Sequence, residues 1–97
     1  MIWHLVSVEE RHAAFPETFD IHPRTERETV LPGQFVKIIF ECDGFSERMW
    51  VVVTRRDDDG YCGSLRNTPH EGLGLDWGDL IQFGPEHIAQ VAPIGFF

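Results

Sequence analysis

The side chains that could bind a metal ion are scattered along this 97-residue chain. Its five histidines are at least eight residues apart, so no local pair has the spacing of a metal-binding motif. The run Asp57-Asp58-Asp59-Gly60 has consecutive acids, whereas an EF-hand calcium loop needs alternating ones and a glutamate at its twelfth position, which here is Thr68. We therefore expect no metal and no cofactor, and we interpret the acidic run as a hairpin turn.

Nucleophilic catalysis has little support in the sequence. It needs a nucleophile beside an oriented base, and the serines and cysteines lack the local signatures of known hydrolases. Asp76 and Asp79, on either side of Trp77-Gly78, are explained more simply by a tight entry into a strand. We expect no enzymatic activity. The alternative left open is a small hydrolase-type enzyme that uses His70 or His87 with a carboxylate.

The grouping that favours binding joins two neighbouring strands. Arg48 and Trp50 share one face of a strand because side chains alternate along it, and Asn67 and His70 follow the next strand. Trp50 is either a core residue, the simpler reading, or part of a shallow groove floored by Trp50 or Trp77. Aromatic and arginine side chains are the anchors that partner-binding surfaces favour, so these five residues form the candidate binding site.

Composition sets the class of partner. Sixteen acids against eight bases give a net charge of −8, which repels polyanions, so we expect neither nucleic acid nor an anionic membrane as a partner. A protein partner, basic in character, is the expectation that remains. The sequence contains neither a signal-peptide pattern nor an apolar run near the ~20 residues of a spanning helix, and a cytoplasmic location is predicted.

The elements that must position these residues belong to one domain, 1–97, that is mainly β. Ser7 and Glu10 have the form of a capping box and predict a short helix over residues 8–14. The segment 16–32 holds three prolines and is expected to be ordered but irregular. Period-two alternation and turn residues predict strands over residues 2–6, 34–42, 48–56, 61–66, 79–84 and 88–92.

Short antiparallel strands with a one-turn break at 85–87 are typical of a small SH3-like barrel or a strongly bent sheet. An OB-type barrel is the alternative. The barrel is expected over residues 33–94, with 1–32 as an N-terminal extension that packs on it and covers one open edge. In this register Cys42 faces residue 48 and Cys62 faces residue 55, ~20 Å apart, so both thiols are expected to be free.

Apolar residues gather at both ends of the sequence. Leaving them in water would create an unusually large exposed patch. We therefore expect residues 2–6 to lie beside 88–94, with Trp3 covering Phe96 and Phe97. A monomer follows from this arrangement, and a two-fold dimer that buries the same residues is the alternative.

Four stretches carry a resemblance to a known group of proteins. They are Val36-Lys37-Ile38-Ile39-Phe40, Glu47-Arg48-Met49-Trp50-Val51, Gly63-Ser64-Leu65-Arg66-Asn67-Thr68-Pro69, and Gly78-Asp79-Leu80-Ile81-Gln82-Phe83 with His87-Ile88. In these the chain resembles an uncharacterised family of small bacterial proteins, domains of unknown function, some of which look like toxin-immunity proteins. The resemblance implies a shared fold and a bacterial source, and it implies no catalytic residues. Sequence and resemblance together favour a non-enzymatic protein-interaction module, with an immunity-type inhibitor of a basic partner as one concrete version.

Overall fold

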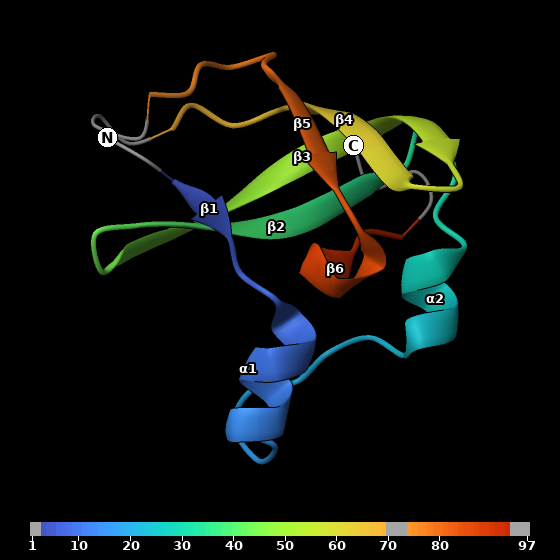
Figure 1. The fold of residues 1–97 in the computed structure, drawn as a ribbon. Helices are drawn as coiled ribbons and strands as arrows, with labels where there is room; N and C mark the ends of the chain where they lie inside the picture. The colour runs from blue at the N-terminus through green and yellow to red at the C-terminus, as the bar shows by residue number, and fades with distance from the viewer. Residues whose placement is uncertain (1–2, 70–73, 94–97) are drawn as a thin grey trace.

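The computed structural model describes residues 3–69 and 74–93. They form a mainly β structure with two short helices (Figure 1). In chain order the elements are β1 (His4–Leu5), α1 (Val8–Ala14), α2 (Arg24–Glu28), β2 (Phe35–Cys42), β3 (Phe45–Asp57), β4 (Gly60–Leu65), β5 (Leu80–Phe83), the 3₁₀ helix η1 (Pro85–His87) and β6 (Ile88–Val91).

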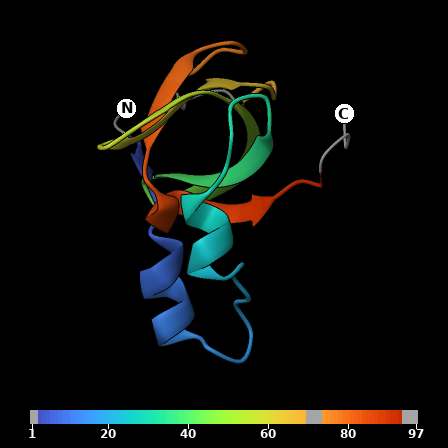
Figure 2. The same cartoon turned by 90° about the vertical axis from the view of Figure 1, so that its right-hand side faces the viewer.

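The strands form one antiparallel sheet that curls into a half-barrel, which confirms the predicted fold class. Its order is β1-β2-β3-β4-β5, and β6 returns to pair with β2. The curvature is clearest in Figure 2, where the strands surround the barrel interior and both helices lie below it, on the side of η1 and β6. The one-turn break predicted at 85–87 is η1, which reverses the chain between the last two strands.

Two tight hairpins build the centre of the sheet. Asp43 and Gly44 both have positive φ, 49° and 79°, which is typical of the two-residue turn that matches the twist of adjacent strands. Because this turn is so short, Cys42 faces Phe45 and not residue 48, and β3 begins three residues earlier than predicted. Across the second hairpin Arg55 faces Cys62, as predicted.

The core lies inside the half-barrel. Strand side chains of one parity fill it, as period-two alternation predicts. Its fully buried members of greatest volume are Phe40, Ile38, Met49, Leu65, Ile81 and Ile88. Position 63 accommodates only glycine, since a Cβ there would lie 2.7 Å from the carbonyl oxygen of Val52. Residues of the other parity therefore form the outer face of the sheet.

The N-terminal extension contains the predicted helix and one that was not predicted. α1 begins after Ser7, whose hydroxyl accepts a hydrogen bond from the backbone N–H of Glu10 at 3.3 Å. The segment 16–32 was expected to be irregular, but it contains α2, which starts after Pro23. A run of only five residues gives too few turns for a periodic signal, which is why the pattern missed it.

The extension covers part of the outer face of β2. A second apolar cluster forms there from Val6, Val8, Ile39 and Ala89, with Phe19 packed against it. Ile39 shares the outward parity of Lys37, so its burial comes from the extension and not from the barrel core.

β1 is shorter than predicted and lies in a different place. It pairs with β2, where Leu5 faces Phe40, and not with the 88–94 segment. β6 occupies the neighbouring part of the same β2 edge, where Val91 faces Val36. Trp3 packs edge-to-face on Phe40, with ring centroids 5.4 Å apart.

Two expectations about the ends and the thiols have different outcomes. Phe96 and Phe97, which Trp3 was expected to cover, lie outside the described residues. Cys42 is buried, Cys62 is partly exposed, and both are free, as predicted.

Candidate functional site

The candidate site lies on the outer face of the sheet, away from the barrel core. Met49 and Val51 point into the core, and Trp50 between them points outward and is half-buried. The simpler reading of Trp50 as a core residue is therefore wrong. Its backbone N–H donates a hydrogen bond to the side-chain Oδ1 of Asn67, so the exit of β4 is fastened beside the tryptophan.

Lys37 completes the surroundings of Trp50, and sequence reasoning missed it. Lys37 faces Trp50 across the β2–β3 pair, and its Nζ lies 4.6 Å from the centre of the indole ring. A cation at this distance from a ring face is attracted by the negative face of the π system. The signal was present in the alternation of β2, but the pairing depends on the tight Asp43-Gly44 turn, which the predicted register did not have.

A second cation–aromatic pair lies beside the first. Arg66 follows β4, and its backbone N–H donates to the carbonyl oxygen of Trp50 at 2.9 Å. Its guanidinium carbon lies 4.6 Å from the centre of the Trp77 ring. Trp77 is held near by its own loop, in which the N–H of Gly78 donates to the carbonyl of Leu65 at 2.7 Å. Trp77 is nevertheless 57% exposed.

We call the surface formed by Lys37, Trp50, Arg66 and Trp77 the tryptophan face. An outward row of less polar residues borders it, because Val52 faces Ser64 across β3–β4 and Ser64 faces Leu80 across β4–β5. Leu80 is 72% exposed. The tryptophan face therefore carries two cations and two large aromatic rings next to an exposed apolar side chain, on a chain whose net charge is −8.

Arg48 lies on the same side of β3 as Trp50, but its side chain lies against the N-terminal extension and not on the tryptophan face. Its guanidinium carbon lies 5.4 Å from the centre of the Phe19 ring. It lines a hollow of about 520 Å³ with residues 20–23, Glu26 and the middle of β6. The structure thus brings Trp50, Asn67 and Trp77 together and sets Arg48 apart against the extension. His70 lies outside the described residues.

His87, the candidate base of the alternative enzyme, forms a hydrogen bond with the backbone of its own turn. Its Nδ1 accepts a hydrogen bond from the backbone N–H of Gly84 at 3.0 Å, which closes η1. Burial lowers the pKa of His87, although the nearby Glu86 opposes this effect. Because Nδ1 is used as an acceptor, the imidazole cannot also donate from it to Glu86, whose carboxylate lies 3.6 Å away. The hollow beside it, about 390 Å³, has no Ser, Thr or Cys among its described lining residues.

His22 forms the other carboxylate–imidazole pair. Its Nδ1 lies 2.7 Å from a carboxylate oxygen of Glu26, and its Nε2 accepts from the backbone N–H of Val91 at 3.4 Å. Both ring nitrogens are thus used to join α2 to β6. A general base needs one nitrogen open to a substrate, so this geometry favours a structural role.

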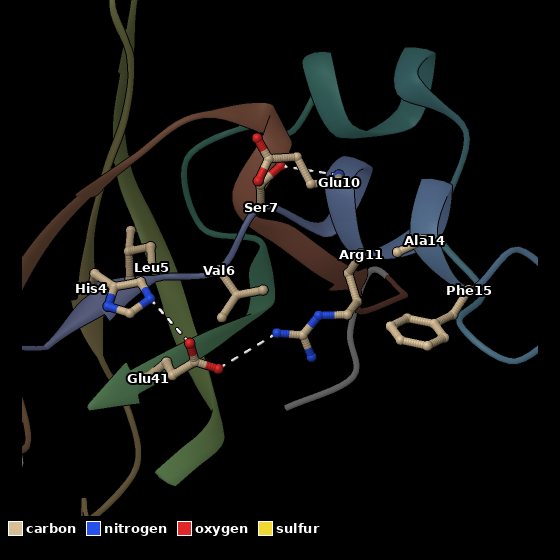
Figure 3. Close-up of a pocket in the computed structure, with 9 residues that line it drawn as sticks. All are labelled: His4, Leu5, Val6, Ser7, Glu10, Arg11, Ala14, Phe15 and Glu41. Atoms are coloured by element: carbon tan, nitrogen blue, oxygen red, sulfur yellow. Dashed lines mark hydrogen bonds and ion pairs between the residues drawn. The ribbon is translucent and has the colours of Figure 1, made fainter. Parts of the chain in front are cut away.

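A further hollow lies where α1 meets the sheet (Figure 3). Glu41 of β2 lies between an imidazole and a guanidinium, with one carboxylate oxygen 3.2 Å from Nε2 of His4 and the other 3.5 Å from a guanidinium nitrogen of Arg11. Phe15 lies at the far rim of the hollow, which measures about 300 Å³. The Glu41 carboxylate thus fastens α1 to β1 and β2.

Two further classes of site are absent from residues 3–69 and 74–93. Within these ranges no three His, Cys, Asp or Glu side chains are grouped closely enough to hold a metal ion. None of the helices in the described part of the chain is long and apolar enough to cross a membrane.

Comparisons with known proteins supply no relatives. No protein-family model, no curated protein sequence and no solved structure matches this chain. The resemblance to a family of small bacterial proteins therefore stays a prediction, and functional inference rests on the geometry described above.

Proposed function

We propose that this chain is a non-enzymatic module that binds another protein through the tryptophan face. The observation that carries the proposal is Trp77, more than half exposed beside Arg66, with the Lys37–Trp50 pair one strand away. Tryptophan and arginine are the residues most enriched among the energetically dominant positions of protein interfaces. A monomer rarely leaves such side chains together in water unless they meet a partner.

The alternative of a small hydrolase has weaker support. His87 is used to close η1, and both nitrogens of His22 are used to hold α2 on β6. A catalytic histidine must reach a substrate or nucleophile with one nitrogen while a carboxylate orients the other. The proposal of binding without catalysis follows from this use of the histidines.

We also propose a compartment, an oligomeric state and a class of partner for the protein. Two free thiols favour a reducing compartment, so we place the protein in the cytoplasm, as a monomer. Inhibition of a toxin by direct binding, the immunity-type role, is one concrete version of the module. The net charge of −8 favours a basic partner at long range, whereas the cations of the tryptophan face favour acidic side chains at the contact itself.

The experiment compares two aromatic truncations of equal exposure. Trp77→Ala removes the centre of the tryptophan face, and Phe15→Ala removes a side chain that is also 57% exposed, beside the hollow at α1. Partners are captured from the native lysate with the wild-type chain and both variants, and the affinity of the recovered protein is then measured by calorimetry. We expect Trp77→Ala to weaken binding at least about tenfold, because interface tryptophans often contribute 2 kcal/mol or more.

Phe15→Ala is expected to bind like the wild type. Equal binding by all three proteins, or loss only with Phe15→Ala, would remove the tryptophan face as the site. Hydrolysis of a captured molecule by the wild type but not by His87→Asn would favour the enzyme alternative.

A further inference from the structure

We infer that the tryptophan face binds an acidic, extended segment of its protein partner, with two carboxylates that meet Lys37 and Arg66. This inference rests on the proposed function and gives that partner its chemistry. The net charge of −8 alone would suggest a basic segment. The segment is inferred to be acidic because the local charge of the tryptophan face is positive.

The two cations are placed on either side of Trp50. Lys37 faces Trp50 from β2, and the N–H of Arg66 bonds to the Trp50 carbonyl from the β4 side. Their backbones are therefore two strand spacings apart, roughly 10 Å at about 4.8 Å per spacing. A segment in the extended polyproline II conformation advances about 3.1 Å per residue with three residues per turn, so its residues i and i+3 point to the same side and lie roughly 9 Å apart. A pair of acids three positions apart matches the two cations.

Each cation is held ready for a carboxylate. The ring under it restricts its motion, so less conformational entropy is lost when an anion binds. Hydrogen bonds between a charged donor and a carboxylate are stronger than neutral ones, and the guanidinium of Arg66 can form two in parallel. Neither Lys37 nor Arg66 forms an ion pair with a carboxylate among the described residues, so their charge on this face is uncompensated there.

The neighbouring acid belongs to the loop and not to the cations. A carboxylate oxygen of Asp79 accepts the backbone N–H of Asp76 at 2.9 Å, which fixes the turn that presents Trp77. Leu80, exposed at the end of the outward row, offers an apolar contact to the same segment. The face thus fits a segment that combines acidic and apolar side chains.

Single-stranded nucleic acid is the competing anion, since aromatic rings and cations also bind bases and phosphates. Affinity for a polyanion grows with the number of cations that neutralise phosphates. Two cations on a chain with sixteen acids supply little of that affinity. The observations therefore favour a protein segment.

The test pans a displayed library of random dodecapeptides against the whole chain. We expect enriched peptides to carry Asp or Glu at positions i and i+3 with an apolar residue nearby. The best peptide is then titrated against Arg66→Glu and Arg56→Glu, which change the net charge equally. Arg56 is also exposed but lines a hollow at the other end of β3, near the acidic turn.

Arg66→Glu is expected to weaken binding of the peptide at least about tenfold, because it removes a charge-assisted hydrogen bond and places a like charge opposite the peptide carboxylate. Arg56→Glu is expected to change the affinity less than about twofold. Arg66→Gln repeats the test without charge reversal, and circular dichroism checks that each variant is folded. Enrichment of Lys- and Arg-rich peptides, no enrichment, or equal effects of both arginines would overturn the inference. Tighter binding of a dodecamer of deoxythymidine than of any selected peptide would also overturn it.

The proposed function is tested separately by the Trp77→Ala and Phe15→Ala capture. If that pair behaves as expected while the peptide test fails, the face binds a protein of different chemistry. If Trp77→Ala has no effect on capture, the face itself is rejected.

Discussion

Arg27 is a buried residue that ties the N-terminal extension to the barrel. Its side chain is 3% exposed, and its Nε donates to the carbonyl of His22 at 2.9 Å. One terminal nitrogen donates both to a carboxylate oxygen of Glu9 at 2.9 Å and to the carbonyl of Pro85 at 3.0 Å. One guanidinium thus joins α1, the segment before α2 and η1. The hydrogen bond from Arg27 is the main reason that the pKa of Glu9 is lowered.

Replacement of Arg27 should destabilise the fold strongly. Arg27→Met keeps much of the volume but leaves two carbonyls and one carboxylate without this donor. Breaking one side of a buried ion pair costs about 3–5 kcal/mol. We expect a loss near the lower figure, because Glu9 keeps its ion pair with Arg24. The free energy of unfolding is measured by urea titration.

Arg56→Met is the matched control, since Arg56 is exposed and a surface substitution usually changes stability by less than about 0.5 kcal/mol. Equal losses for the two variants would show that Arg27 does not act as this connection.

His87 should make stability depend on pH. Burial lowers its pKa in the folded state below the ordinary 6.5, so the unfolded chain binds a proton more readily. Its contribution to stability is therefore complete above pH 6.5 and is lost as the pH falls below that value. We expect the wild type to lose more stability between about pH 7.5 and 5.5 than His87→Asn, which keeps an acceptor for the Gly84 N–H without titrating in this range. Identical pH profiles of the two proteins would contradict this role.

At the scale of elements, Tyr61 of β4 contacts the end of α2. The hydroxyl of Tyr61 on β4 donates to the carbonyl of Arg27 at 2.7 Å and accepts from the N–H of Val30 at 3.3 Å. The Tyr61 ring stacks on Phe83, with centroids 5.4 Å apart. The hydroxyl therefore fastens the end of α2, while the ring belongs to the barrel core.

Tyr61→Phe separates these two functions. It keeps the ring and removes both hydrogen bonds, which should cost about 1–3 kcal/mol. Amide hydrogen exchange should accelerate in α2 and at Val30, while the β2–β3 amides change only with global stability. If hydrogen exchange accelerated equally across the chain, the hydroxyl would stabilise the whole fold and not α2 in particular.

The elements also show how far sequence reasoning reached. Period-two alternation gave the strands of the half-barrel, and the Ser7–Glu10 pair gave α1, because these signals are local. Three results needed contacts between distant residues: the burial of Ile39 under the extension, the pairing of Lys37 with Trp50, and α2. Of the predicted site, Trp50, Asn67 and Trp77 come together, whereas Arg48 was placed by strand parity alone, and its aromatic neighbour Phe19 comes from the extension.

At the scale of the whole molecule, the fold keeps its two thiols apart and unequally accessible. Cys42 is buried in the core, and Cys62 lies on the outer side of β4, partly exposed. Under denaturing conditions a thiol reagent should titrate two free cysteines. In the native protein one should react quickly and the other only as the barrel opens.

Cys62→Ser and Cys42→Ser assign the two phases. Removal of Cys62 should abolish the fast phase, and Cys42→Ser should leave it intact. A reducible, protected pair in the wild type would contradict the β2–β3–β4 register.

β2 is the strand on which the time course of folding should depend. One of its edges pairs with β3 through a two-residue turn. The other edge pairs with β6, which brings Val36 beside Val91, a residue 55 positions later in the sequence. Closing so long a loop costs conformational entropy before the contacts that stabilise the pairing can form. Sheets with distant pairings therefore fold slowly, in milliseconds to seconds. The β2–β3–β4 hairpins are thus expected to form early and the return of β6 to limit the rate. Until β6 pairs there, the part of this β2 edge at Val36–Ile38 stays open, and at high concentration a neighbouring chain could donate the missing strand in its place.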